Sequence, residues 1–383
     1  MNRRLGVAGA LAALALTAAG CSQGGNAVTI DVQPSMTAVP TDANSVPETF
    51  DGIPDVVGTA ANDLTTPWGM DFLPNGVAVV TERTTGRVLL ITPPGDGQST
   101  GTVTDLGKIK NLDFHGDGGL LGVAVSPGFV TDSSLYFYES THKDNRVVRM
   151  PLTDAGLGQG SDVLTGIPHG RTNNGGRLRF GPDGYLYVGT GDAGKPALAQ
   201  KPKSLAGKIL RIGPDGSAAP GNPKNGLVWA SGFRDVLGIA FDGDGQLWAT
   251  DAGPNQDELD RILPADNGGW PRHEGEGGPK RFVHPAITWA PARATPGGLT
   301  FAGGYLWVSG VEGQNLWRVK VEAGQAGDTT PYFDGTTKST YGALRAVGLA
   351  PDGRLWLATD NTETATKKHK APSGDDRILL IRP

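Results

Sequence analysis

Short runs of alternating apolar and polar residues recur along most of the chain and predict strands. In each copy, one apolar run is followed by a turn containing Pro, Asp, Asn or Gly and then by a second apolar run. The six copies begin near Gly69, Gly122, Arg177, Gly238, Gly298 and Gly348. Turns such as Pro74-Asn75-Gly76 and Pro182-Asp183-Gly184 favour hairpins, because Asn, Asp and Gly accept positive φ and proline presets the entry.

A second series of short apolar strands interleaves with the first. Its six members are Gly86–Ile91, Asn145–Met150, Gly207–Ile212, Asp257–Ile262, Gln314–Val319 and Asp376–Ile381. Both series repeat about every 50–60 residues, the length of a four-stranded blade with generous loops. A β-sandwich would not need six matched pairs of strands. The sequence therefore predicts an all-β fold, a six-bladed β-propeller of four-stranded antiparallel blades that occupies residues 51–383 as one domain.

The composition is consistent with many tight turns and argues against a nucleic-acid partner. The 383 residues include 59 glycines and 28 prolines without a collagen-like period. A net charge of −5 provides no basic surface for nucleic acid, whereas a small neutral substrate is compatible with it. Aromatic residues repeat within the predicted strands, and we expect them to pack between blades. They are Trp248, Trp307, Trp356, Tyr185 and Tyr187.

The N-terminus has the pattern of an export signal. Asn2-Arg3-Arg4 is basic, Leu5–Ala19 is apolar, and small residues then precede Cys21, the only cysteine. This pattern predicts a lipoprotein signal peptide over residues 1–20, after which Cys21 is lipidated. The alternative is an ordinary secretory signal followed by a chance cysteine. With one cysteine, no internal disulfide can form.

The residues that follow are polar and predict a tether. Residues 21–50 contain scattered Pro, Thr, Ser and Gly, which is typical of a flexible linker. We expect the protein to be exported and anchored to the lipid bilayer through Cys21, on the outer face of the bacterial cytoplasmic membrane. A monomer is a sufficient unit for such an arrangement.

Longer motifs also occur in a fixed order from Pro67 to Val319. They include PWGMDFLPNG, HGDGGLLG, NGGRLRFGPDG, GTGDAG, GFRDVLG and DAGPNQDELDRI. Together with LRAVGLAPDGRLWLATDN near the C-terminus, they resemble the soluble aldose (glucose/sorbosone) dehydrogenase family, which uses pyrroloquinoline quinone (PQQ) and calcium. The resemblance implies a cofactor over one face of the propeller, where a histidine takes a proton from a sugar hydroxyl and hydride goes to the quinone.

Several positions retain the residue types that this family uses. The resemblance places Asp192 near the sugar and Arg234 and Arg345 on the cofactor. It places the carbonyl groups of Gly253 and Pro254 on calcium, although two carbonyls are too few for a full oxygen shell. At Asp117 the family usually has Gln or Glu.

Other positions depart from the family at its most important groups. Asn173 stands at the position of the base histidine, and asparagine cannot accept a proton near neutral pH. Losing a general base typically costs roughly 10²–10⁴ in rate. Asp235 replaces an asparagine, Glu312 a lysine and Ala343 an arginine. The changes at Glu312 and Ala343 alone would give an acidic cofactor two fewer cations and one more anion.

Alternative roles are open for some of these residues. His169, four residues before Asn173, is either a replacement base or an ordinary exposed loop histidine, and the same choice applies to His115. Asp235 and Glu312 either belong to the site or pair with Arg234 or a neighbouring lysine.

Two functions follow from these observations. The favoured one is a cell-surface lipoprotein propeller with reduced or lost catalysis, whose top face binds a small sugar or an envelope ligand. The alternative is an active PQQ- and calcium-dependent oxidoreductase that oxidises an aldose or a related alcohol.

Overall fold

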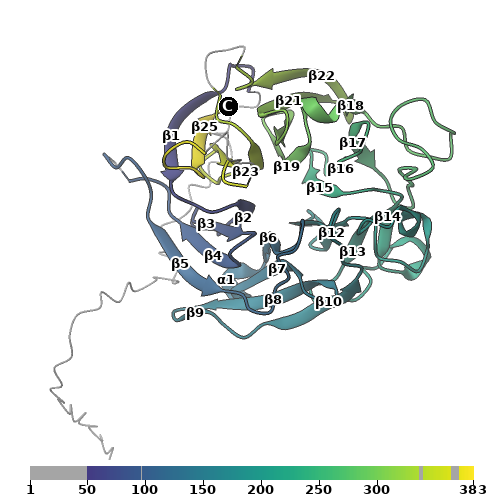
Figure 1. The fold of residues 1–383 in the computed structure, drawn as a ribbon, viewed down its shortest axis with the longest axis horizontal. Coiled ribbons are helices and arrows are strands. Elements are labelled where there is room, and N and C mark those ends of the chain that lie inside the picture. The colour runs from purple at the N-terminus through teal and green to yellow at the C-terminus, as the bar shows by residue number, and fades with distance from the viewer. Residues whose placement is uncertain (1–49, 96, 336–339, 364–370) are drawn as a thin grey trace, which may run out of the picture.

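The computed structural model describes residues 50–383, except for residues 96, 336–339 and 364–370. The predicted signal peptide, Cys21 and the tether before Phe50 lie outside the described residues. Six antiparallel sheets are arranged in a ring (Figure 1). The six-bladed β-propeller predicted from the sequence is therefore confirmed, and five of its sheets have four strands each.

The first three blades follow the chain order from the inner to the outer strand. Blade 1 contains β2 (Pro67–Phe72), β3 (Ala78–Glu82), β4 (Arg87–Ile91) and β5 (Val103–Lys108). Blade 2 contains β6 (Leu120–Val125), β7 (Ser134–Ser140), β8 (Asn145–Thr153) and β10 (Ser161–Ile167), with a short β9 (Gly156–Leu157) beside β8 and helix α1 (Phe129–Asp132) between β6 and β7. Blade 3 contains β11 (Gly175–Phe180), β12 (Leu186–Thr190), β13 (Lys208–Ile212) and β14 (Val228–Ser231), with the 3-10 helices η1 (Pro196–Gln200) and η2 (Pro223–Asn225) in its loops.

The remaining blades continue the pattern until the last one. Blade 4 contains β15 (Val236–Phe241), β16 (Leu247–Asp251), β17 (Asp257–Ile262) and β18 (Ile287–Trp289), followed by η3 (Pro291–Arg293). Blade 5 contains β19 (Pro296–Ala302), β20 (Tyr305–Gly310), β21 (Asn315–Glu322) and β22 (Gln325–Tyr332). Blade 6 contains β23 (Leu344–Leu349), β24 (Leu355–Thr359), β25 (Ile378–Arg382) and, as its outer strand, β1 (Asp55–Ala61).

Strand β1 closes the ring. It pairs antiparallel with β25, so the two ends of the described chain share one blade. None of the helices in the described part of the chain is long and apolar enough to cross a membrane.

The repeated glycines lie where neighbouring blades approach each other. A Cβ atom added to Gly122 on β6 would stand 2.1 Å from the carbonyl oxygen of Gly176 on β11. At Gly69 on β2, the corresponding distance to the carbonyl oxygen of Leu121 is 2.7 Å. Glycine therefore recurs at the start of the repeat because the innermost strands leave no room for a side chain.

The three repeated tryptophans pack as predicted. Trp248, Trp307 and Trp356 occupy the second strands of blades 4, 5 and 6 and are fully buried. Trp307 belongs to a cluster that joins blade 5 to residues of blade 6 such as Leu344 and Leu355. These contacts between blades hold the ring together through its apolar core.

The alternation of strand direction gathers one set of loops at one end of the ring. In an antiparallel blade, the connection between the second and third strands lies at the same end as the entry to the first strand. We call this end the top face. The predicted site residues from Asp117 to Arg345 lie in these connections or just beyond them, so the fold brings them to one surface.

Candidate ligand-binding site on the top face

Asn173 and Asp192 form the centre of the site on blade 3. The Asn173 Nδ2 group donates to Asp192 Oδ1 at 2.9 Å. The same Asp192 oxygen accepts the Gly194 N–H at 2.7 Å, and its Oδ2 accepts the Trp270 Nε1–H at 2.9 Å. Asp192 is fully buried and Asn173 is 8% exposed. The side chain at the position of the family's base is therefore a hydrogen-bond donor that is held in place by a buried carboxylate.

The backbone of Asn173 is also held in place, by its conformation and by a hydrogen bond. Its φ is 58°, a left-handed conformation that asparagine tolerates better than most residues. Its N–H donates to Asp117 Oδ2 at 3.0 Å, and the Asp117 N–H donates to the carbonyl of Arg171 at 2.9 Å. These contacts connect blades 2 and 3 at the edge of the site.

Arg234 and Asp235 enter the site from the loop between β14 and β15. Arg234 Nη1 donates to the carbonyl of Ala252 at 2.7 Å, and its guanidinium lies 5.9 Å from the centre of the Trp270 ring. Asp235 Oδ1 accepts the Gly175 N–H at 2.8 Å. Within the described residues, no ion pair joins Arg234 to Asp235 or to Glu312.

The acids behind Arg234 are buried and have raised pKa values. Burial raises the pKa of Asp235 to about 8; the Gly175 N–H opposes this, and repulsion from Asp117 and Asp251 adds to it. Burial also raises the pKa of Asp251 to about 8. Asp235 and Asp251 are therefore mostly protonated near neutral pH.

The predicted calcium position lies on the loop between β16 and β17. Gly253 is partly buried and Pro254 is exposed, and the Gly253 N–H donates to Asp257 Oδ1 at 3.1 Å. Among the described residues, no group of three or more His, Cys, Asp or Glu side chains is arranged to hold a metal ion.

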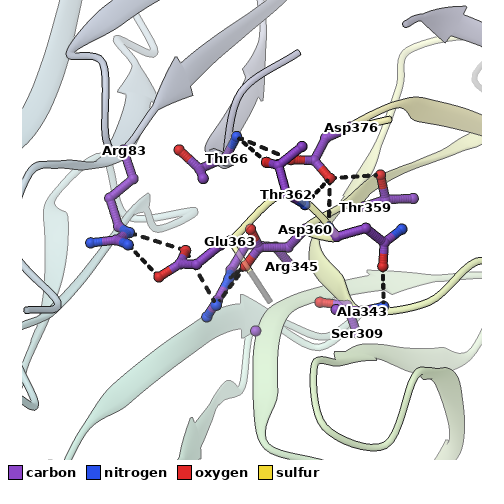
Figure 2. Close-up of polar contacts among 12 residues, drawn as sticks. Thr66, Arg83, Ser309, Ala343, Arg345, Thr359, Asp360, Thr362, Glu363 and Asp376 are labelled. Carbon is purple, nitrogen blue, oxygen red and sulfur yellow. Dashed lines mark hydrogen bonds and ion pairs between the residues drawn. The ribbon is translucent and has the colours of Figure 1, made fainter. Parts of the chain in front are cut away.

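A second polar network joins blades 6 and 1 (Figure 2). Arg345, at the start of β23, forms an ion pair with Asp360 through Nη2 at 2.6 Å and Nε at 2.7 Å. Its Nη2 also lies 4.0 Å from Glu363 Oε2. Arg83 forms an ion pair with the same Glu363 carboxylate and donates to the carbonyls of Gly116 and Gly118, both at 2.9 Å.

The electrostatics of this network follow from burial and pairing. Burial alone would lower the pKa of Arg345, but the carboxylates of Asp360 and Glu363 outweigh it and raise that pKa. Deeper in the ring, burial lowers the pKa of Arg177 to about 9, and repulsion from Arg345 contributes. The carboxylates of Asp360 and Glu363 thus neutralise a cluster of cations.

The two other altered positions lie on blades 5 and 6. Ala343 is 1% exposed, and its N–H donates to Asn361 Oδ1 at 2.9 Å. Glu312 is exposed in the turn between β20 and β21. Neither side chain therefore adds a cation to the site.

The two histidines lie around another acid. His169 Nε2 is 3.6 Å from Asp113 Oδ2, and the side chain is 15% exposed. The expectation of an exposed loop histidine is thus wrong for His169, because three loops meet there. His115 is exposed, and its Nδ1 lies 2.5 Å from Asp113 Oδ1; His142 Nδ1 lies 3.3 Å from Oδ2. Neither His115 nor His169 forms one of the hydrogen bonds described above for Asn173 and Asp192.

Sequence reasoning missed several residues of the site. Trp270 and Arg83 lie within motifs that are visible in the sequence, NGGWP and TERTTG, but nothing in those motifs indicates their partners. Glu363 contacts Arg83 across 280 positions of the chain. No local pattern could have identified that contact.

The fold and this site define a six-bladed propeller whose top face is lined by polar side chains from several blades. The sequence model of the Glucose / Sorbosone dehydrogenase family matches residues 64–368, and the chain belongs to that family. The family suggested by the sequence motifs is thereby confirmed.

Individual relatives agree with this assignment. The PQQ-bound aldose sugar dehydrogenase of Streptomyces coelicolor is 39% identical, with a TM-score of 0.79 over 88% of this chain and 99% of that one. The uncharacterised protein slr1608 of Synechocystis is 30% identical over 77% of this chain and 81% of its own length. Quinoprotein glucose dehydrogenase B of Acinetobacter calcoaceticus is 31% identical over 56% of this chain, and the match spans about half of that relative, 52%.

Proposed function

We propose that this protein is a ligand-binding propeller of the sugar dehydrogenase family in which catalysis has been reduced or lost. Its top face binds a small sugar or a sugar-like envelope component through the hydrogen-bonding groups around Asn173 and Asp192. The observation that carries the proposal is the Asn173–Asp192 hydrogen bond. An amide fixed as a donor at this position cannot take a proton from a sugar hydroxyl.

The acidic quinone used by relatives does not fit the top face as its side chains stand. A cofactor with several carboxylates needs unpaired cations. Here Arg345 and Arg83 are already paired with the protein's own carboxylates, and Ala343 and Glu312 supply no positive charge. Of the predicted cofactor positions that the structure describes, only Arg234 offers a cation without a paired carboxylate, which is too few for several acidic groups. The binding function therefore includes no catalytic step through PQQ, and calcium belongs only to the enzymatic alternative below.

An active enzyme is the second candidate, and two observations favour it. Arg234 is present and bonds to the carbonyl of Ala252, the residue before Gly253, and a relative with 39% identity is a PQQ-bound aldose sugar dehydrogenase. In that case the protein would oxidise an aldose or a related alcohol with PQQ and calcium.

The proposal also includes the location of the protein. Export, lipidation at Cys21 and attachment to the outer face of the cytoplasmic membrane would place the propeller among envelope ligands. Support comes from the basic start, the apolar run and the single cysteine of the N-terminus. Metabolic labelling with a fatty-acid analogue, with Cys21→Ala as the control, tests this part.

Calorimetric titration of residues 50–383 separates the two candidates. We expect no tight binding of PQQ in the presence of calcium and measurable binding of sugars from a panel of neutral saccharides. Calcium-dependent PQQ binding together with sugar oxidation would overturn the non-catalytic proposal. In that case, Asn173→His should raise turnover of an already active protein, because it restores a base.

A further inference from the structure

The carboxylate of Glu363 lies between two arginines that come from different blades. Its carboxylate pairs with Arg83 through both oxygens, and its Oε2 lies 4.0 Å from Arg345 Nη2. Figure 2 shows the carboxylate between the two guanidinium groups. The side chains of Arg83 and Arg345 are only 7% and 15% exposed, whereas that of Glu363 is 29% exposed. The acid therefore lies on the solvent side of two partly buried cations.

The backbone that carries Glu363 is anchored by a buried acid. Asp376 is fully buried and accepts the N–H groups of Asn361 at 2.6 Å and Thr362 at 3.2 Å. It also accepts the Thr66 N–H at 3.1 Å and the Thr362 hydroxyl. The residue before Glu363 is thus held against blade 1, and the glutamate projects from a fixed point. Pairing with Arg83 therefore orders the Glu363 side chain but little further backbone.

With Glu363 present, the number of acidic side chains around this position equals the number of arginines. Arg83, Arg345 and the buried Arg177 supply three positive groups, and Asp360, Glu363 and Asp117 are the acids near them. Without Glu363, the two outer guanidinium groups would present forked donors with the geometry that binds a ligand carboxylate. With it, an incoming anion meets groups that are already paired.

We propose that Glu363 is a specificity-determining residue: its carboxylate occupies an anion-binding position between Arg83 and Arg345 and makes the top face select neutral polyols over carboxylate ligands. This inference rests on the proposed sugar-binding function and names the charge class of its ligand. It also assigns Arg83 as a ligand-facing cation. The acidic quinone of the relatives is one of the ligands that Glu363 would exclude.

The test compares anion binding with and without the acid. Benzene-1,3,5-tricarboxylate and PQQ serve as probes in calorimetric titrations of the wild type, Glu363→Ala and Glu363→Gln. We expect both variants to bind the tricarboxylate at least about tenfold more tightly than the wild type, a factor that corresponds to 1.4 kcal/mol. Adding Arg83→Met to Glu363→Ala should remove the gain.

A matched control removes the same charge elsewhere. Asp154 is exposed in the turn between β8 and β9, so Asp154→Ala changes the net charge without touching Arg83 or Arg345. Equal gains for Asp154→Ala and Glu363→Ala, or no gain for either Glu363 variant, would overturn the inference. Glu363→Gln keeps the size of the side chain and serves if the alanine variant is poorly folded.

Neutral sugars distinguish this inference from the proposed function. If the wild type binds neutral saccharides but the Glu363 variants gain no anion binding, only the inference fails. If the variants gain anion binding but no saccharide binds the wild type, the role of Glu363 in excluding anions stands. The proposed sugar-binding function and the preference for polyols would then both fail.

Discussion

The two sides of the top face satisfy their polar groups by different means. On blades 3 and 4, the buried Asp192 accepts hydrogen bonds from uncharged donors of Asn173, Gly194 and Trp270. On blades 6 and 1, guanidinium groups pair with the carboxylates of Asp360 and Glu363. Both sides thus find within the chain the partners that an external ligand would otherwise supply. The stability that the first side contributes should nevertheless depend on pH, whereas the pairing energy on the second side should depend on the salt concentration.

The largest effect is expected at Asp192. Replacing it with alanine leaves three donors, among them the Asn173 amide, without their acceptor, and each buried donor left unsatisfied costs about 1–3 kcal/mol. We expect Asp192→Ala to lower the free energy of unfolding by about 3 kcal/mol or more, measured by urea denaturation. Asp154→Ala is the control and should change stability by less than about 0.5 kcal/mol. Similar values for the two variants would show that the hydrogen bonds at Asp192 contribute little.

The next effect concerns pH and has the opposite sign. Burial raises the pKa of Asp235 to about 8 in the folded protein, above a value of about 3.9 when unfolded, so the folded state binds the proton more tightly. Its favourable contribution is complete below about pH 4 and is lost as pH rises through about 8. Asp235→Asn should therefore stabilise the protein at pH 8, by at most about 5 kcal/mol for a pKa difference of about four units, and have little effect at pH 4.

Thermal or urea unfolding at several pH values checks this prediction. The variant should reduce the slope of stability against pH without abolishing it, because Asp251 also has a pKa of about 8. A difference between the variant and the wild type that is the same at every pH would contradict the assignment.

A smaller effect is expected for the pair on blades 6 and 1. A double-mutant cycle with Arg83→Met and Glu363→Ala should give a coupling energy of about 1 kcal/mol, because Glu363 is partly exposed. Raising the salt concentration should reduce the coupling, since exposed charges are screened. A coupling that does not change with salt would mean that the pair behaves like the hydrogen bonds on the other side.

The smallest effect is expected on blade 5. Glu312 is exposed, so Glu312→Lys should change the free energy of unfolding by less than about 0.5 kcal/mol. Urea denaturation checks this value, and a large change would reveal a contribution from blade 5 to one of the two networks.

Sequence patterns predicted the inner part of each blade well. Strands such as β12 (Leu186–Thr190) are entirely buried, so their apolar residues reflect real packing. Outer strands such as β5 (Val103–Lys108) are mostly exposed and carry no such signal. The role of β1 was also invisible, because a pairing between the two ends of the chain leaves no local trace.

The candidate site was predicted as a set of positions but not as a set of contacts. Motifs placed Asn173, Asp192 and Arg234 at one end of the ring, since the order of strands determines where loops gather. They could not show that Glu363 pairs with Arg83 or that His169 lies beside Asp113, because those contacts depend on the closure of the whole ring.

The pairing of β1 with β25 sets the order in which the molecule can be completed. The first strand of the propeller to be synthesised finds its partner only when the last strand exists. During translation, blade 6 therefore remains unfinished until nearly the whole chain has been made, and such long-range pairing is intrinsically slow. A chain that has lost its final residues would leave β1 with an unpaired edge, a known template for aggregation.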